Sequence, residues 1–141
     1  MILHKLNRFQ DVGLLILRIG IGIAFMVHGA PKLLGGPERW ADLGGAMGNL
    51  GITFAPTFWG FMAGAAEFGG GLLLVLGFLF RPALFLLVFT MIVAATQHIV
   101  TGQGSPWHAI EAGILFLSLI FIGPGRYSLD ERAHQRKRSL Y

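Results

Sequence analysis

Long apolar stretches alternate with short polar ones along this chain, and four of them have the length of a membrane-spanning helix. They lie at residues 12–30, 57–79, 82–101 and 107–123. A bilayer core of about 30 Å requires roughly 20 apolar residues in a helix. The last stretch reaches that length when Trp107 and the residues before it lie in the membrane interface, which tryptophan favours. The pattern predicts an all-α membrane protein, a four-transmembrane-helix bundle.

The ends of these stretches carry helix-terminating residues. Only "FRP" separates the second stretch from the third, and Pro82 suits the first turn of a helix, so we expect a tight helical hairpin there. "GPG" at 123–125 ends the fourth stretch, because proline cannot continue a helix and glycine permits the exit turn. Residues 31–56 are too polar and glycine-rich to cross a membrane. They predict a short helix that starts near Pro37 and Glu38, followed by a loop.

Composition supports the membrane class. Hydrophobic residues make up 54% of the 141 residues and charged residues 13%, whereas soluble domains carry about 25% charged residues. The chain has no cysteine, which excludes disulfides, thiolate metal sites and cysteine nucleophiles within it. Arg18 interrupts the first apolar stretch and no A-x-A site follows His28, so we do not expect a cleaved signal peptide.

The distribution of Lys and Arg predicts the orientation. Eight of the eleven lie on one side of the predicted bundle: Lys5, Arg8, Arg81, Arg126, Arg132, Arg136, Lys137 and Arg138. The other side has Lys32 and Arg39, and Arg18 lies within a span. The positive-inside rule therefore places both termini in the cytoplasm and residues 31–56 outside, in the inner (plasma) membrane of a bacterial or archaeal cell.

The chain reads as one transmembrane domain at residues 12–130 followed by a basic tail at 131–141. The tail could bind anionic lipid headgroups, or it could serve only as a topogenic signal. Nucleic acid is not an expected partner, because the tail lacks a recognition fold.

Ionisable residues inside the spans are the functional candidates, since such residues are rare in membranes and usually face the bundle interior. They are Arg18, His28, Glu67, His98, His108 and Glu111. At a rise of about 1.5 Å per residue, Arg18 and Glu67 fall near the middle of their spans, close enough to meet. The other four fall in the outward half. The sequence thus predicts a central Arg–Glu pair and an outer histidine-rich ring, although the pair could serve only to fix helix register.

Small residues follow the same helix faces as these charges. One stripe contains Arg18, Gly22, Phe25 and Gly29, and the other contains Gly60, Gly64, Glu67 and Gly71. Small residues at such spacings allow two helices to approach closely. We expect the two faces to meet within the chain, although the same stripes could serve a homo-oligomer.

The whole pattern resembles the DoxX family of small four-helix bacterial membrane proteins. The matching stretches are "LLILRIGIGIAFMVHGAPKL", "AAEFGGGLLLVLGFLFRPA" and "WHAIEAGILFLSLIFIGPGRYSLD". This family is related to a membrane subunit of thiosulfate:quinone oxidoreductase, and other members are linked to redox-stress and thiol-homeostasis complexes at the inner membrane. The resemblance implies a redox-associated protein with redox-complex subunits as partners, but kinship of fold does not transfer an activity.

The leading hypothesis is a protein that engages a quinone or an electron-transfer partner at an outward-facing polar site, as an oxidoreductase subunit if it is enzymatic. Arg18 and Glu67 would hydrogen-bond one quinone carbonyl or relay its proton. Glu67 or Glu111 would exchange protons, and His28 or His98 would bind the other carbonyl.

Two further classes are open. His28, His98, His108 and Glu111 could offer ligands to copper or zinc, and two histidines on facing helices could hold a haem. Alternatively, the chain is a non-enzymatic scaffold subunit that docks a partner through residues 31–56 or its basic tail.

Overall fold

A computed structural model describes residues 7–138, and this part of the chain is helical and contains no strand. Its elements, in chain order, are α1 (Gln10–Leu33), α2 (Gly36–Gly44), the 3₁₀ helix η2 (Gly45–Leu50), α3 (Pro56–Leu76), α4 (Phe80–Thr101), α5 (Trp107–Ile122) and α6 (Leu129–Arg138). The four long helices α1, α3, α4 and α5 correspond to the four predicted spans. The predicted all-α four-helix bundle is therefore confirmed.

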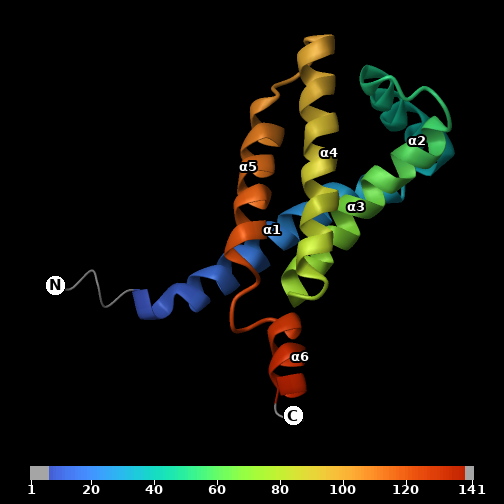
Figure 1. Ribbon diagram of the computed structural model, residues 1–141. Coiled ribbons are helices and arrows are strands. Elements are labelled where there is room, and N and C mark those ends of the chain that lie inside the picture. The colour runs from blue at the N-terminus through green and yellow to red at the C-terminus, as the bar shows by residue number, and fades with distance from the viewer. Residues whose placement is uncertain (1–6, 139–141) are drawn as a thin grey trace.

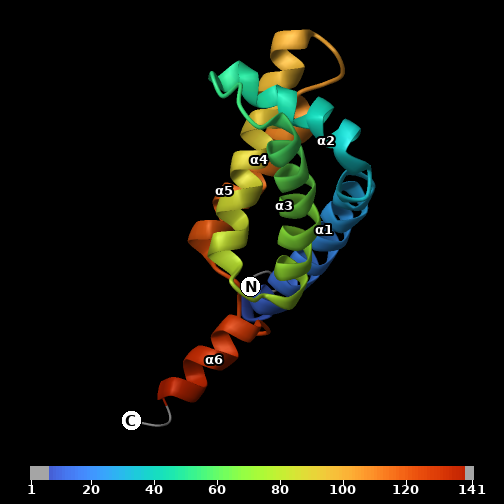
Figure 2. The same ribbon diagram turned by 90° about the vertical axis from the view of Figure 1, so that its right-hand side faces the viewer.

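The long helices form two pairs. In Figure 1, α4 and α5 stand side by side, while α1 and α3 form a second, oblique pair that carries α2 at its far end. Helix α3 also packs on α4 and so joins the pairs, and η2 lies against α4. Figure 2 shows α6 projecting from the end of the bundle opposite α2.

Helices α1 and α3 meet along the two glycine stripes that the sequence predicts. A Cβ atom added at Gly22 would lie 2.6 Å from the Gly71 carbonyl oxygen, and one added at Gly64 would lie 2.8 Å from the Leu33 nitrogen. Such close approach of backbones requires glycine, because any side chain would hold the helices apart. The stripes are thus used within one chain, and a homo-oligomer built on them stays a prediction.

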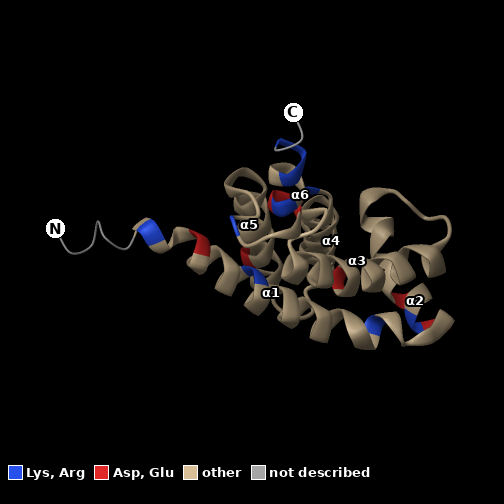
Figure 3. Cartoon of the chain, turned by 90° about the horizontal axis from the view of Figure 1, so that it is seen from below, with Lys and Arg blue, Asp and Glu red and all other residues tan. Residues whose placement is uncertain are grey.

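The exterior of the bundle suits lipid. Among the described residues, three helices are long and apolar enough to cross a membrane: α1 with the preceding turn, α3 and α4. Helix α5 is apolar but shorter, with 16 residues. Large apolar side chains such as Ile16, Val27 and Phe121 are exposed, and Figure 3 shows most of the charged residues near the start of α1, around α2 and around α6, with a few along α1 and α3 between them. The chain is a membrane protein.

The turns between the helices lie where the sequence predicts them. Gly77 and Leu79 adopt positive φ angles between α3 and α4, and Pro82 lies in the first turn of α4, which confirms the predicted hairpin. Helix α5 ends at Ile122, directly before the Gly-Pro-Gly segment.

Two boundaries differ from the predicted ones. Helix α1 continues through Pro31 to Leu33, because a proline in the last turn removes only one helical hydrogen bond. The segment predicted as mostly loop is largely helical, formed by α2 and η2. Helix α6 crosses the predicted limit between the domain and the basic tail, and that limit stays a prediction.

Candidate functional site

Arg18 does not pair with Glu67, contrary to the sequence prediction. Its guanidinium is buried and donates from Nη1 to the Pro124 carbonyl oxygen at 2.7 Å and from Nη2 to the Tyr127 carbonyl oxygen at 3.0 Å. Arg18 therefore holds the segment that follows α5 against the end of the bundle. Backbone carbonyl groups thus accept from two of its three nitrogens, an arrangement common for intramembrane arginines, while Nε is buried and has no partner among the described residues.

The register of α1 against α3 explains the wrong prediction. Arg18 and Glu67 both lie near the middle of their spans in sequence, but Glu67 packs beside Gly29 and not beside Arg18. Arg18 precedes Gly29 by eleven residues, which is about 16 Å along the helix. The two side chains consequently lie at different levels of the bundle.

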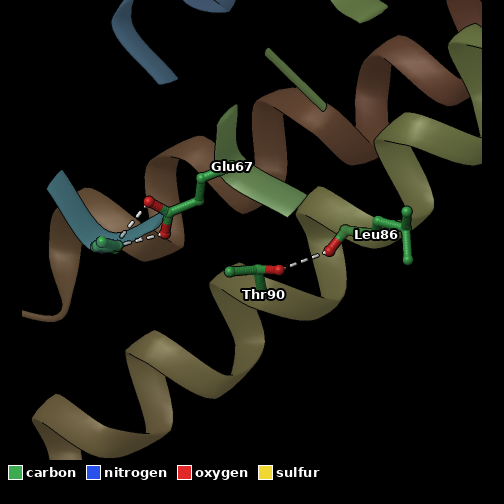
Figure 4. Close-up of polar contacts among 4 residues, drawn as sticks. Glu67, Leu86 and Thr90 are labelled. Atoms are coloured by element: carbon green, nitrogen blue, oxygen red, sulfur yellow. Dashed lines mark hydrogen bonds and ion pairs between the residues drawn. The ribbon is translucent and has the colours of Figure 1, made fainter. Parts of the chain in front are cut away.

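Glu67 pairs instead with Lys32, a residue that sequence reasoning assigned to the external loop. The Lys32 ammonium donates to both carboxylate oxygens, at 2.7 Å and 2.8 Å (Figure 4). The Glu67 side chain is 3% exposed and that of Lys32 is 30% exposed. The sequence does contain a signal for this pairing. Lys32 follows Gly29 by three residues and therefore lies on the same helix face as Arg18 and Gly29.

This ion pair lies in the walls of two cavities. The larger one, here called the α3–α4 cavity, has a volume of about 490 Å³ and is lined mainly by apolar side chains of α3, α4 and η2. Its polar lining residues are Lys32, Asp42, Glu67, Thr90, Gln97 and His98. Ala46 and Met47 of η2 also line it, and the Asn49 side-chain amide donates to the Gln97 side chain.

The smaller cavity, here called the histidine cavity, has a volume of about 110 Å³. It is lined by His28, His98 and His108 together with Lys32 and Glu67. The structure thus gathers the three predicted histidines from α1, α4 and α5. Because Lys32, Glu67, Ala94 and His98 line both cavities, these four residues form the boundary between them.

Two polar contacts orient the groups around this boundary. His98 Nδ1 lies 2.6 Å from the Gln103 carbonyl oxygen, which fixes the imidazole ring. Thr90 lines the α3–α4 cavity, and its hydroxyl donates to the Leu86 carbonyl oxygen at 2.9 Å, which leaves the hydroxyl oxygen free to accept a hydrogen bond (Figure 4).

The remaining predicted site residues do not join this arrangement. Glu111 is exposed, and neither Glu111 nor Arg18 lines either cavity. Within residues 7–138, no group of three or more histidine, aspartate or glutamate side chains is placed to hold a metal ion. The metal site of His28, His98, His108 and Glu111 stays a prediction, and Glu111 lies outside the cavity that the three histidines line.

Comparison with known proteins agrees with this fold. A family model described as DoxX matches residues 13–102, which is more than half of the chain. The chain is 32% identical over 138 residues to the inner membrane protein YqjF of Escherichia coli, covering 93% of this chain and 99% of that protein. It is 31% identical over 136 residues to the inner membrane protein YphA of the same organism, covering 87% and 91%.

A protein of Haemophilus influenzae that bears only the name "Uncharacterized protein" is 30% identical over 138 residues, covering 92% of this chain and 97% of that one. No solved structure matches the chain.

Proposed function

The chain belongs to the DoxX family, and from this premise we propose that it binds a lipid-soluble quinone in the α3–α4 cavity. Lys32, Glu67 and His98 would contact the polar ring of the quinone. The observation that carries the proposal is a buried carboxylate, paired with one lysine, in the wall of a mainly apolar cavity.

The cavity suits an amphipathic ring. Its volume of about 490 Å³ lies within the range of about 300–1,000 Å³ usual for small-molecule sites, which are mostly apolar with a few converging polar groups. Among the described residues, the Lys32 ammonium has two hydrogen bonds, both to Glu67. An ammonium has three N–H groups, so the third is available to a quinone carbonyl.

The two cavities suggest separate roles for ring binding and proton exchange. Reduction of a quinone to a quinol consumes two electrons and two protons. Glu67 touches both cavities and would pass protons between the ring and the histidine cavity, where His28 and His108 lie with ring centroids 5.6 Å apart. A redox partner protein would deliver the electrons, in keeping with the relation of the family to a quinone oxidoreductase subunit.

We further propose that the protein lies in the inner membrane with both termini in the cytoplasm. Relatives of the chain are named inner membrane proteins, and the eight-to-two division of Lys and Arg supports the orientation. The α2–η2 segment, and with it the end of the α3–α4 cavity that this segment lines, would then face the outside.

Calorimetric titration of the purified protein in mild detergent with a short-tailed 1,4-benzoquinone tests the proposal. We expect saturable binding, and Glu67→Gln should weaken it about tenfold or more, because the substitution removes the charge that orients Lys32. Glu111→Gln is the matched control, since this glutamate is exposed and lines neither cavity. Circular dichroism confirms that each variant is folded. Absence of binding by the folded wild type would favour the scaffold hypothesis instead.

A further inference from the structure

One face of α4 contributes a continuous stripe of side chains to the wall of the α3–α4 cavity. The lining residues recur at steps of three or four, which places them on one side of a helix. They include Leu86, Phe89, Thr90, Val93, Gln97 and His98. From Leu86 to His98 the stripe advances by twelve residues, which is about 18 Å along the helix axis. The cavity therefore extends along more than half of α4.

The polarity of this wall changes from one end of the cavity to the other. Gln97 and His98 lie toward the end of the bundle that carries α2, and Asp42 of α2 lines the cavity there as well. Leu86 and Phe89 lie nearer to the turn between α3 and α4. The cavity thus has a polar end beside α2 and an apolar end toward the interior of the membrane span.

The Lys32–Glu67 ion pair lies between these two ends. A Cβ atom added at Gly70 would lie 3.0 Å from Leu87 Cγ, so Gly70 of α3 and Leu87 of α4 are at one level. Glu67 precedes Gly70 by three residues, about one helical turn toward α2, which places it near the level of Thr90. A ligand ring held by the ion pair therefore has polar side chains on one side of it and apolar side chains on the other.

The apolar end of the cavity adjoins the lipid. Leu86 is 50% exposed and Phe89 is 44% exposed, although both line the cavity and both lie within the apolar span of α4. No described residue of α5 lines the cavity, and α1 contributes only Lys32. Helix η2 reaches α4 through the Asn49–Gln97 hydrogen bond, and Gln97 is about 12 Å along the axis from Phe89. Among residues 7–138, no other helix therefore separates the apolar end from the hydrocarbon of the membrane.

We infer that the ligand carries a long apolar tail, which runs from the ion pair along Phe89 and Leu86 and leaves the cavity between α3 and α4 into the lipid. The opposite direction is unfavourable, because an apolar chain beside Gln97 and His98 would remove polar groups from water without offering them hydrogen bonds. Leu86 and Phe89 would thus determine the specificity for the tail. The inference rests on the proposed function and adds the tail, its direction and the residues that contact it.

The test compares two probes that share one 1,4-benzoquinone ring: one carries a decyl tail and the other only a methyl group. Calorimetry measures their binding to the full chain in detergent for the wild type, Leu86→Trp and Phe89→Trp. The larger tryptophan side chain occupies space at the apolar end, so each variant should weaken binding of the decyl probe about fivefold or more. Binding of the methyl probe should stay within about twofold.

Phe85→Trp is the matched control for these variants. Phe85 is adjacent to Leu86 on α4 and is 60% exposed, but it lines neither cavity. Its substitution should leave the affinity for both probes unchanged. Circular dichroism confirms that each variant is folded.

The outcomes separate this inference from the proposal on which it rests. Selective loss of the decyl probe in Leu86→Trp or Phe89→Trp supports the tail path. Equal weakening of both probes in both variants, or no weakening of either probe, overturns it. If Glu67→Gln weakens both probes while Leu86→Trp and Phe89→Trp weaken neither, the proposed function stands and the tail path falls. If the folded wild type binds neither probe, both fall together.

Discussion

A methyl group added at Gly22 should force α1 and α3 apart. The new Cβ atom would lie 2.6 Å from the Gly71 carbonyl oxygen and 2.7 Å from Val75 Cγ2. An ordinary contact begins at 3.4 Å, so the helices must separate by about 0.8 Å or α1 must slide. Overpacking of this kind costs about 1–3 kcal/mol. At about 4 °C per kcal/mol for a chain of this size, Gly22→Ala should lower the unfolding midpoint by about 4–12 °C.

Gly20→Ala is the matched control for that experiment. Gly20 lies two residues away on α1, is exposed, and has nothing within 4 Å of an added Cβ atom. Its substitution should leave the midpoint unchanged or raise it, because alanine favours a helix over glycine by about 1 kcal/mol. Thermal unfolding of both variants in mild detergent, followed by circular dichroism, gives the comparison. Equal midpoints for Gly20→Ala and Gly22→Ala would refute the assigned α1–α3 contact.

Three further predictions follow from other contacts. Arg18→Lys should destabilise the fold by about 2 kcal/mol, because an ammonium cannot reproduce both carbonyl contacts of the guanidinium. Thermal unfolding measures this loss, and the quinone affinity of the folded variant should stay unchanged. Asp130→Ala should lower the free energy of unfolding by about 1 kcal/mol, because the Asp130 carboxylate accepts from two backbone N–H groups at the start of α4. Glu131→Ala is the control: it loses one exposed contact within α6 and should have a smaller effect on thermal unfolding. On intact cells, a membrane-impermeant thiol reagent should label Phe54→Cys but not Gln135→Cys, and the opposite pattern would invert the proposed orientation. The chain has no native cysteine, so each label reports the introduced residue alone.

The sequence predicts the helices well because each leaves a strong local signal. Apolar length defines the four spans, Pro82 marks the α3–α4 hairpin, and the Gly-Pro-Gly segment marks the end of α5. The glycine stripes also predict which faces of α1 and α3 meet. These signals lie within single helices or turns, where sequence spacing translates directly into geometry.

The site was less predictable because it depends on the register between helices. Arg18 and Glu67 share the predicted faces but not the same level, and Lys32 takes the place of Arg18 because α1 continues past Pro31. The prediction that His28, His98 and His108 lie near one another is correct, because these residues occur at matching depths on three helices.

Binding of a short-tailed 1,4-benzoquinone to the purified wild type and to Glu67→Gln tests the central claim most directly. The α3–α4 cavity, with the Lys32–Glu67 pair in its wall, predicts saturable binding that Glu67→Gln weakens about tenfold or more and Glu111→Gln leaves unchanged. Equal affinity of the folded wild type and folded Glu67→Gln would contradict the claim that this partly buried ion pair is the quinone site.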